Sequence, residues 1–550
     1  MSINISELSG RKGLTENLFE KIGDLAQQTG TPSKEELEKL SKEFLVGKAN
    51  VYGSATFYDF TREENKGKKV YVCQGSACLC AGTQENVTQK LKTHFDENEI
   101  GTMYCLGRCH ENSAFFYENK NYSGNDIDSF SKEKNTKTIE ATDDYQIKSS
   151  GVSVLCNNDI QFEDFKSSLE NLFSKNKTDI LTEIKTSGLR GRGGAGFPMS
   201  FKLEAVQKET SDVKYIVCNA DEGDPGAYSD RYLLEKQLAK VLLGMMMAGF
   251  VTGANWGVLY IRAEYPESIA WVEKKLVDLY AENLLGKNIL NSGFDFDFKL
   301  IKAQGAYICG EETALLSSIE GQRPEVRVRP PYPAQKGLFN KPTVVNNVET
   351  LACLPYILKN GGEAFSKLGD GKSTGTKLIS LDSFFNHPGI YEVEMGTTLK
   401  FVIEELGGGF KEDIKAMHIG GPLGGLVPVS KINDLKISFE SFQSNGFLLG
   451  HASVVCIPQH FPLINYLAHL FQFTAHESCG KCFPCRIGST RGYEMIENAI
   501  SNNEKMDRTL LNDLLETLEI GSLCALGGGL PLPIKNALHY FEDELAGYFE

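Results

Sequence analysis

The sequence predicts a multidomain protein of the α/β and α+β classes. Two observations lead to this expectation: short apolar strands alternate with longer helical segments through the middle of the chain, and two sets of closely spaced cysteines stand near its two ends. A length of 550 residues is enough for roughly three to five domains.

Composition is that of a soluble globular protein, with 41% apolar and 23% charged residues. The most apolar run, residues 239–251, is too short to cross a membrane, so no membrane insertion is expected. A net charge of −15 argues against nucleic acid as a partner, because nucleic acid favours a basic face. Residues 1–12 lack the apolar core of a signal peptide, and several of the 14 cysteines sit as single thiols in apolar contexts. We therefore expect a cytoplasmic location, where thiols stay reduced.

The N-terminal part begins with helices and continues as a small α/β domain. Residues 1–65 show helical periodicity. Residues 69–73 are predicted to form a strand that runs into the first cysteine pair, and residues 99–104 and 114–117 are predicted strands around the second. Residues 119–150 are rich in Asn, Ser, Lys, Asp and Thr, and we expect a domain edge and a linker there.

Strands and helices alternate in the next segment, which is typical of an α/β domain. The predicted elements are a strand at 215–218, a helix at 231–250, a strand at 257–261 and a helix at 266–284. Residues 377–455 hold short β-rich runs with glycine turns, which predicts a compact β-rich domain. Residues 461–550 are largely helical and carry the C-terminal cysteines.

The C-terminal cysteines have the spacing of an iron–sulfur site. Cys479, Cys482 and Cys485 form two CxxC spacings that share the middle cysteine, and Cys524 follows much later. Three thiolates on one loop and a distant fourth suit a [4Fe–4S] cluster. Zinc is the alternative, but its sites more often show separate CxxC pairs or Cys/His pairs.

A second set consists of Cys73, Cys78, Cys105 and Cys109, with Cx4C and Cx3C spacings. Two pairs from two loops can place two thiolates on each iron of a [2Fe–2S] cluster. Two disulfides or a zinc site are the alternatives. Cys80 is too close to Cys78 for both to bind comfortably, so we interpret it as a packing residue.

A glycine-rich loop, residues 187–198, contains two arginines. Glycines let backbone amides approach a ligand, and arginines favour an anion, although a simple surface turn is an equal alternative. Two other segments place polar groups after an apolar run: Asn219, Asp221 and Glu222 in the first, and Gly310-Glu311-Glu312 in the second. We interpret both runs as strands of an α/β fold, whose ends bind ligands. A carboxylate there can bind a ribose diol and repel a 2′-phosphate. The alternative is that each carboxylate caps a helix.

Seven segments spread over the chain are GLRGRGGAGFP, CNADEGDPGAY, YIRAEYP, GAYICGEETAL, PTVVNNVETL, ESCGKCFPCR and SLCALGGGLP. Together they resemble the flavoprotein subunit of respiratory complex I and its relatives in NAD-reducing hydrogenases and NAD-dependent formate dehydrogenases. Residues 1–120, including YGSATFYDF, resemble the small thioredoxin-like [2Fe–2S] subunit of the same enzymes. The chain therefore resembles a fusion of the two subunits.

The resemblance implies a division of the chain into five domains. They are an N-terminal helical bundle (1–65), a thioredoxin-like [2Fe–2S] domain (66–145), a Rossmann-like domain for FMN and NAD(H) (151–370), a ubiquitin-like β-grasp domain (375–457) and a C-terminal helical bundle with the [4Fe–4S] cluster (461–550).

The resemblance also implies binding residues. FMN would lie along Gly191, Arg192, Gly193, Lys202, Asn219, Asp221, Gly310, Asn346 and Asn347. NAD(H) would contact Phe197, Glu222, Glu311, Glu312, Arg329 and Tyr332. The chain departs from the family at residues 199–203, which lose a tryptophan, at Ala205, where an aromatic ring for one side of the adenine is expected, and at residues 451–460, which replace a glycine-rich strand and an acidic turn.

The expected function is that of an NADH:acceptor oxidoreductase module. NADH releases two electrons as a hydride and a cluster accepts one, so FMN is the required converter. Electrons would pass through the clusters to or from a partner subunit of a soluble hydrogenase, a formate dehydrogenase or a similar dehydrogenase. The transfer needs no protein acid or base, and Glu222 is expected to position the nicotinamide. Alternatives are the NADH-input module of complex I, an electron-bifurcating subunit and a non-catalytic electron-transfer scaffold.

Overall fold

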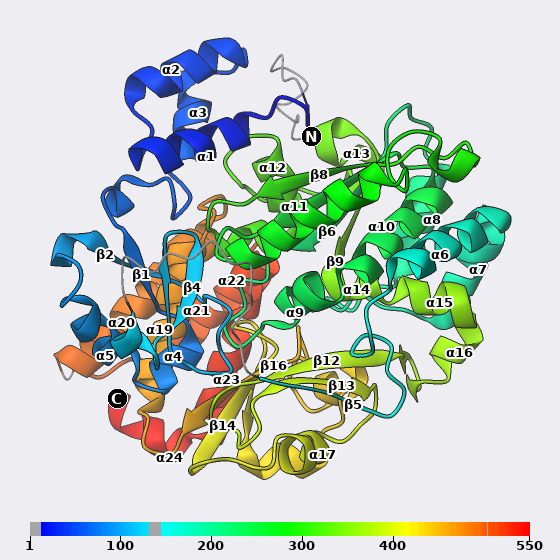
Figure 1. The fold of residues 1–550 in the computed structure, drawn as a ribbon. Coiled ribbons are helices and arrows are strands. Elements are labelled where there is room, and N and C mark those ends of the chain that lie inside the picture. The colour runs from blue at the N-terminus through cyan, green and yellow to red at the C-terminus, as the bar shows by residue number, and fades with distance from the viewer. Residues whose placement is uncertain (1–12, 131–144, 503) are drawn as a thin grey trace.

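A computed structural model describes residues 13–130, 145–502 and 504–550 of the chain (Figure 1). Its helices and strands are arranged as several units that share buried contacts, and the predicted multidomain α/β and α+β class is confirmed. Within the described residues, no helix is long and apolar enough to cross a membrane.

Three helices open the chain. The side chain of Asn17 accepts hydrogen bonds from two backbone amides and starts the first helix, and a capping box of Ser33 and Glu36 starts the second. The helices are α1 (Leu18–Thr29), α2 (Lys34–Glu43) and α3 (Lys48–Ala55). The prediction of helices in residues 1–65 is confirmed for residues 13–65, and residues 1–12 lie outside the described residues.

A four-stranded sheet follows, in the order β2-β1-β3-β4. Its strands are β1 (Val70–Cys73), β2 (Ile100–Met103), β3 (Ala114–Tyr117) and β4 (Lys120–Ser123), and its helices are α4 (Ser76–Cys80) and α5 (Gln84–Leu91). β1 runs parallel to β2 and antiparallel to β3. The three predicted strands of this region are confirmed.

The linker predicted within residues 119–150 is wrong at the C-terminal end, whereas β4, the edge strand of the first sheet, fits the domain edge predicted for the same segment. β4 forms a hairpin with β3, and β5 (Gln146–Ser150) pairs in parallel with β13 (Gly389–Glu394) in a different sheet. β5 is an edge strand with exposed or half-buried side chains, so its sequence carries no apolar alternation. Residues 131–144 of the predicted linker lie outside the described residues.

The central unit is a parallel sheet in the order β8-β7-β6-β9, with helices around it (Figure 1). The strands are β6 (Tyr215–Ala220), β7 (Trp256–Ile261), β8 (Asp297–Lys302) and β9 (Thr343–Asn347). The helices that matter for the sites below are α8 (Met199–Lys208), α9 (Ser229–Lys236), α10 (Leu238–Thr252), α11 (Pro266–Ala281), α12 (Glu312–Ile319) and α14 (Val348–Ala352). The parallel order agrees with the predicted α/β domain.

Two predictions within this unit need correction. The single helix predicted at 231–250 is two helices, α9 and α10, because the backbone leaves helical geometry at Gln237. The apolar run before Gly310 is not a strand: Tyr307–Gly310 forms one 3-10 turn, and β8 has already ended at Lys302. A short apolar run has no periodicity that separates the two conformations.

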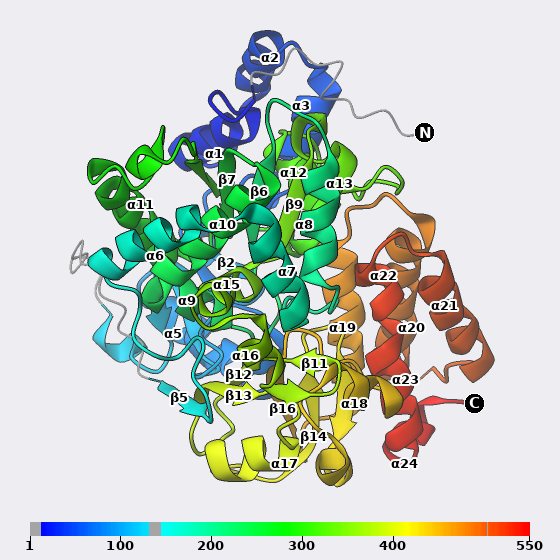
Figure 2. The ribbon, with the colours of Figure 1, turned by 90° about the vertical axis from the view of Figure 1, so that its right-hand side faces the viewer.

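The third sheet is mixed and six-stranded, in the order β15-β14-β16-β12-β13-β5. Its other strands are β12 (Thr376–Leu381), β14 (Ile414–Ile419), β15 (Gly425–Pro428) and β16 (Ser453–Pro458). The C-terminal helices pack on it and form one side of the molecule (Figure 2). They include α19 (Leu463–Glu477), α20 (Ser489–Ser501), α21 (Arg508–Gly521), α22 (Ala525–Gly529) and α23 (Pro531–Tyr540).

Candidate cofactor sites

The four N-terminal cysteines come together on the loops of the first sheet. Cys73 ends β1 and Cys78 lies on α4, while Cys105 and Cys109 lie between β2 and β3. All four are buried. The Sγ atoms of Cys105 and Cys109 are 3.7 Å apart. Two thiolates on one tetrahedral metal, with bonds of about 2.3 Å, would be separated by about 3.8 Å. The pair therefore has the geometry of two ligands of one iron.

Hydrogen-bond donors surround these sulfurs. The amide of Gly226, in the loop after β6, donates to Sγ of Cys109 at 3.2 Å. The thiol of Cys78 donates to Cys73 and, despite burial and with help from the amide of Gly75, lowers the pKa of Cys73 to about 7. Since the thiolate is the form that binds metal, the loop favours the ligating state of Cys73.

The alternatives of disulfides and zinc fit these sulfurs less well. All fourteen cysteines are free thiols. Within the described residues, no three cysteine sulfurs all lie within 4.8 Å of one another. Four thiolates on one zinc ion would lie about 3.8 Å from one another, a spacing that the sulfurs of this set do not all share. Cys80 is not part of the set: it is buried in the core of the six-stranded sheet, as expected for a packing residue.

The four C-terminal cysteines meet where α19 ends and α22 begins. Cys479 follows α19, Cys482 and Cys485 lie in the next turns, and Cys524 is the N-cap of α22. Burial raises the pKa of Cys485 to about 11 and that of Cys524 to about 12. A bound metal centre is what deprotonates such buried thiols.

Close packing around this loop depends on a glycine. A Cβ on Gly527 would lie 2.7 Å from Cβ of Cys485, so only glycine lets the first turn of α22 approach the cysteine loop. The same region carries exposed apolar side chains. They are Phe483 (71% exposed), Ile487, Ile520 (76% exposed) and Leu523.

The glycine-rich loop lies against the carboxyl ends of two parallel strands. Asn219 of β6 pairs in register with Asn347 of β9. A Cβ on Gly193 would stand 2.9 Å from Cβ of Asn347, so the loop presses on this strand end. Nδ2 of Asn219 donates to the carbonyl oxygen of Gly310 at 2.7 Å. The structure thus brings four predicted FMN residues together at the edge where α/β sheets bind ligands.

Three further predicted FMN residues have buried polar atoms without a hydrogen-bond partner among the described residues. These atoms are Nδ2 of Asn346, Oδ2 of Asp221, and Nε and Nη1 of Arg192. Such atoms are rare and indicate a group that the protein alone does not supply. Asp221 also lines a water-sized cavity of about 10 Å³ with Arg262 and Tyr307, so water is a second possible partner for it.

The two arginines of the loop both contact other parts of the protein. Arg192 is fully buried, and its Nη2 donates to the carbonyl oxygen of Thr374 at 2.5 Å. Its backbone amide donates to Oγ1 of Thr350 at 2.8 Å. Arg190 forms an ion pair with Glu440 at 2.6 Å. Arg190 is thus engaged by Glu440, whereas Nε and Nη1 of Arg192 have no hydrogen-bond partner within the described residues.

Four predicted residues form one ion-pair network beside the loop. Nζ of Lys202 donates to Glu312 at 2.9 Å. Arg329 pairs with Glu312 at 2.8 Å and with Glu311 at 3.1 Å. Glu311 is also the N-cap of α12, where it accepts hydrogen bonds from two backbone amides. The helix-cap alternative is therefore correct for Glu311, and Glu312 is held by two cations.

Exposed aromatic rings lie at the same end of the unit. Phe197 and Tyr332 are 50% and 56% exposed. Phe201, which the sequence patterns do not single out, is 61% exposed and contacts Phe197 edge to face, with ring centroids 6.2 Å apart. Phe201 therefore offers an aromatic surface near the position where the sequence loses a tryptophan.

Glu222 lies in the interior rather than in an open pocket. Its carboxylate accepts hydrogen bonds from the amides of Asp230 and Arg231 at the start of α9, and from the hydroxyl of Tyr265 at 3.1 Å. Burial, together with the charge of Asp230, raises the pKa of Glu222 to about 7. The carboxylate of Glu222 is therefore held inside the protein, away from solvent.

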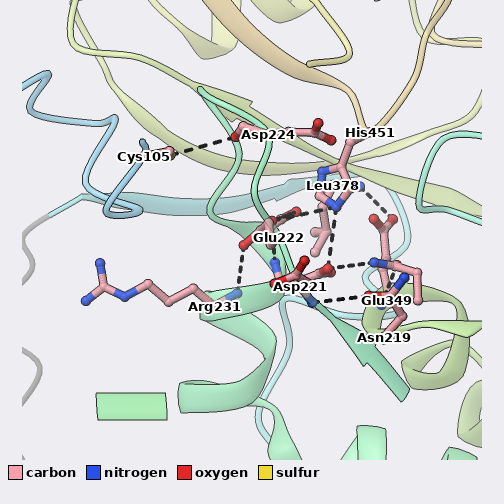
Figure 3. A network of polar contacts seen from close by, with 12 residues as sticks. Cys105, Asn219, Asp221, Glu222, Asp224, Arg231, Glu349, Leu378 and His451 are labelled. Atoms are coloured by element: carbon pink, nitrogen blue, oxygen red, sulfur yellow. Dashed lines mark hydrogen bonds and ion pairs between the residues drawn. The ribbon is translucent and has the colours of Figure 1, made fainter. Parts of the chain in front are cut away.

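Two other residues near this carboxylate are not predicted by the sequence. Asp230 accepts a hydrogen bond from Nδ2 of Asn347 at 2.6 Å. His451 faces Glu222 from the loop before β16 (Figure 3). The sequence offers a signal only for Asp230, which lies in the segment after the end of β6 at Ala220. His451 is visible in the sequence as a departure from the family pattern, without a role.

Three family models match the chain. The Nuo51 FMN-binding domain matches residues 184–356, the NADH-ubiquinone oxidoreductase-F iron–sulfur binding region matches residues 465–548, and the thioredoxin-like [2Fe–2S] ferredoxin matches residues 9–133. These matches confirm FMN, [4Fe–4S] and [2Fe–2S] as the cofactors of the chain. The fold and sites thus define an iron–sulfur flavoprotein.

Curated relatives identify the family. The NADP-reducing hydrogenase subunit HndC of Solidesulfovibrio fructosivorans is 40% identical over 385 residues, which cover 70% of this chain and 78% of that protein. An NADH-quinone oxidoreductase subunit of Rhizobium meliloti (strain 1021) is 38% identical over 375 residues, which cover 68% of this chain and 89% of that protein. The chain belongs to the family of these flavin and iron–sulfur oxidoreductase subunits.

The whole length of the chain has a counterpart among solved structures. A chain of an NAD⁺-reducing [NiFe]-hydrogenase in the air-oxidized state superposes with a TM-score of 0.85, over 100% of this chain and 95% of that chain, at 24% identity. At this identity the likeness concerns the fold. Together with the family models, it confirms the predicted joining of a thioredoxin-like [2Fe–2S] part and a flavoprotein part in one chain.

Proposed function

We propose that the chain oxidises NADH at its FMN and passes electrons singly through its iron–sulfur clusters to a partner subunit. The observation that carries the proposal is the meeting of Asn219, Asn347 and the glycine-rich loop at one sheet edge. FMN, when bound, supplies the conversion between a hydride and single electrons. The residues of this chain bind the reactants and hold them in orientation.

Nine residues are proposed to hold FMN, as backbone amides for the phosphate and polar side chains for the ring and ribityl groups. They are Gly191, Arg192, Gly193, Lys202, Asn219, Asp221, Gly310, Asn346 and Asn347. The unpartnered Nδ2 of Asn346 and the close approach of Gly193 to Asn347 support this assignment. The eight cysteines of the two sets are proposed as the cluster ligands.

NAD(H) is proposed to bind over the ion-pair network, with the rings of Phe197 and Phe201 beside the adenine. Glu311, Glu312, Arg329 and Tyr332 would face the ribose and phosphate groups. Glu222, behind the flavin, would fix the site that receives the nicotinamide. The relative from Solidesulfovibrio fructosivorans is named as NADP-reducing, so the charge on Glu312 is the feature to test for nucleotide choice.

The partner is proposed to be another iron–sulfur or catalytic subunit of a multi-subunit dehydrogenase, such as a hydrogenase or a formate dehydrogenase, in the cytoplasm. The exposed apolar side chains around the C-terminal cysteine loop support docking there, because large exposed apolar groups mark interaction surfaces. Complex I and electron-bifurcating assemblies are other partners with the same chemistry.

Anaerobic purification of the whole chain tests the proposed activity. We expect bound FMN, bleaching of its absorbance by NADH, and NADH-dependent reduction of an artificial acceptor. A chain that carries both clusters but binds no FMN and is not reduced by NADH would instead be a non-catalytic electron-transfer scaffold.

A further inference from the structure

His451 is a buried histidine that faces two carboxylates. It lies in the loop before β16, and its side chain is 5% exposed. Its Nε2 is 3.6 Å from Oε1 of Glu222 and 3.6 Å from Oδ2 of Asp230. Neither ring nitrogen has a hydrogen-bond partner within the described residues. Figure 3 shows the ring of His451 directed toward Glu222 and the segment that follows β6.

The same histidine is connected to the proposed FMN site on two sides. Asp230, which it faces, accepts the 2.6 Å hydrogen bond from Asn347. A Cβ on Gly194 would lie 4.0 Å from the backbone nitrogen of His451, so the glycine-rich loop packs against the loop that carries the histidine. Two separate contacts therefore place His451 beside the flavin residues.

The charges around His451 favour its protonated form. Glu222 and Asp224 face it from the loop after β6, Asp230 faces it from α9, and Lys377 faces it from β12. Lys377 is itself neutralised by its buried ion pair with Glu349. Burial alone would lower the pKa of His451, but the carboxylates of Asp230 and Glu222 raise it to about 9.

We propose that His451 is a positioning residue of the flavin site: its imidazolium holds Glu222 and Asp230 in place and stabilises the reduced cofactor over the oxidised one. The inference rests on the proposed function, because it requires FMN beside Asn347 and the glycine-rich loop. Hydride transfer delivers two electrons and one proton, and so leaves one negative charge on a flavin. A fixed cation nearby stabilises that charge most strongly where water is excluded.

Without His451 the local charge would become more negative. Glu222 and Asp230 would remain as two buried carboxylates beside the flavin, with Glu222 stabilised by neutral donors alone: two amides at the start of α9 and the hydroxyls of Ser229 and Tyr265. Asp230, and Glu222 at pH values above its raised pKa, would oppose the negative charge of the reduced cofactor. The reduction potential reflects the free-energy difference between oxidised and reduced flavin. A change in how tightly the protein binds one form relative to the other therefore shifts the potential.

The test compares the complete chain with His451→Asn and with His460→Asn. His460 is a matched control, since it lies just beyond the other end of β16 and its side chain is 71% exposed. The flavin midpoint potential is measured by equilibrium titration with redox dyes from pH 6 to 10. The dissociation constant of FMN is measured by fluorescence with flavin-depleted protein, for oxidised and reduced flavin.

We expect His451→Asn to lower the flavin midpoint potential below pH 9. It should also weaken the binding of reduced FMN more than the binding of oxidised FMN. The difference from the unmodified chain should shrink above about pH 9, because His451 loses its proton there. His460→Asn should match the unmodified chain. Glu222→Gln removes a negative charge and should raise the potential, which separates a charge effect from general disruption.

Three results would overturn the inference. One is an unchanged potential in His451→Asn at every pH, with FMN bound. Another is a fall of the potential in both His451→Asn and Glu222→Gln, which would reflect disruption. The third is a divalent metal bound stoichiometrically by the unmodified chain and lost in His451→Asn, which would make the histidine a metal ligand. An unmodified chain that binds no FMN contradicts the proposed function itself, and is thereby distinguished from these three.

Discussion

Lys202 on α8 and Glu312 on α12 are joined by a hydrogen bond of 2.9 Å between Nζ and Oε2. Glu312 also pairs with Arg329 at 2.8 Å. One carboxylate thus neutralises two cations that would otherwise be available to a phosphate. A 2′-phosphate bound here would have to compete with Glu312 for both cations, whereas the hydroxyls of a ribose diol would donate hydrogen bonds to the carboxylate.

Glu312→Gln should therefore narrow the preference for NADH over NADPH. The amide keeps the size of the side chain and removes its charge, so Lys202 loses its carboxylate partner, Arg329 keeps only Glu311, and both cations become more available to a 2′-phosphate. We expect the ratio of kcat/KM for the two nucleotides to fall about tenfold, which corresponds to about 1.4 kcal/mol. The measurement is steady-state reduction of an artificial acceptor. Glu519→Gln, which breaks an exposed ion pair with Lys535, should leave the ratio unchanged. Equal kcat/KM values for NADH and NADPH in the unmodified chain would show that the ion-pair network does not select the nucleotide.

Iron content tests the two cysteine sets directly. One [2Fe–2S] and one [4Fe–4S] cluster correspond to about six irons per chain. Cys482→Ala should remove the signal of the [4Fe–4S] cluster and about four irons, while Cys156→Ala, a half-buried thiol outside both sets, should keep all of them. Iron and sulfide analysis with EPR on anaerobic protein is the measurement. Full occupancy of both sites by zinc, without iron, would rule the assignment out.

The cluster sites are predictable from the sequence because cysteine spacing is a local property of the chain. Cys479, Cys482 and Cys485 need only one loop to meet. The long-range partner Cys524 is the single remaining candidate in the C-terminal part, and α22 brings it to the loop. The same reasoning identifies Asn219, because a polar side chain directly after an apolar strand lies at the end of a sheet.

Residues whose role depends on another unit are not predictable in this way. His451 reaches Glu222 only because the six-stranded sheet packs beside the parallel one, and nothing near residue 451 in the sequence indicates this. Phe201 stands in a segment that departs from the family pattern, and only its exposure in the structure identifies it as a surface aromatic. The sequence of β5 resembles a linker because its partner, β13, lies about 240 residues away and its own side chains stay near solvent.

The segment after β5 gives a further prediction. Glu392 on β13 is fully buried, and its carboxylate accepts hydrogen bonds from the amides of Val154, Leu155 and Cys156. Hydrogen bonds to a charged group contribute about 1.5–3 kcal/mol each. Glu392→Gln should weaken several of them at once and open this segment locally, since the chain beyond it is anchored by other contacts.

Hydrogen exchange measures that opening. A loss of about 3 kcal/mol corresponds to exchange about 100-fold faster at these three amides. Glu394→Gln is the control, because within the described residues Glu394 accepts a single longer hydrogen bond, 3.2 Å, from the amide of Val152 in the same segment. Equal exchange in the two variants would mean that strand pairing, and not Glu392, anchors the segment.

The two clusters should differ in their importance for electron delivery. Sγ of Cys109 accepts a hydrogen bond from Gly226, so the N-terminal set lies against the flavin-binding unit. The C-terminal set lies beside the exposed Phe483 and Ile520, the surface proposed for the partner. We therefore expect the [4Fe–4S] cluster to pass electrons to the partner. The [2Fe–2S] cluster should be a side store, which holds electrons away from that route.

Cys482→Ala should abolish reduction of the partner and spare the reduction of FMN by NADH. Cys78→Ala should impair partner reduction far less, because its cluster lies off the main route. Stopped-flow bleaching of the flavin reports the first step, and steady-state assays with the isolated partner report delivery. Loss of a cluster can unfold the unit that holds it, so FMN and the remaining iron are quantified in each variant before its rates are compared. If Cys78→Ala stops partner reduction as completely as Cys482→Ala, with FMN and the other cluster retained, the N-terminal cluster lies on the main path and the assignment of a side store is wrong.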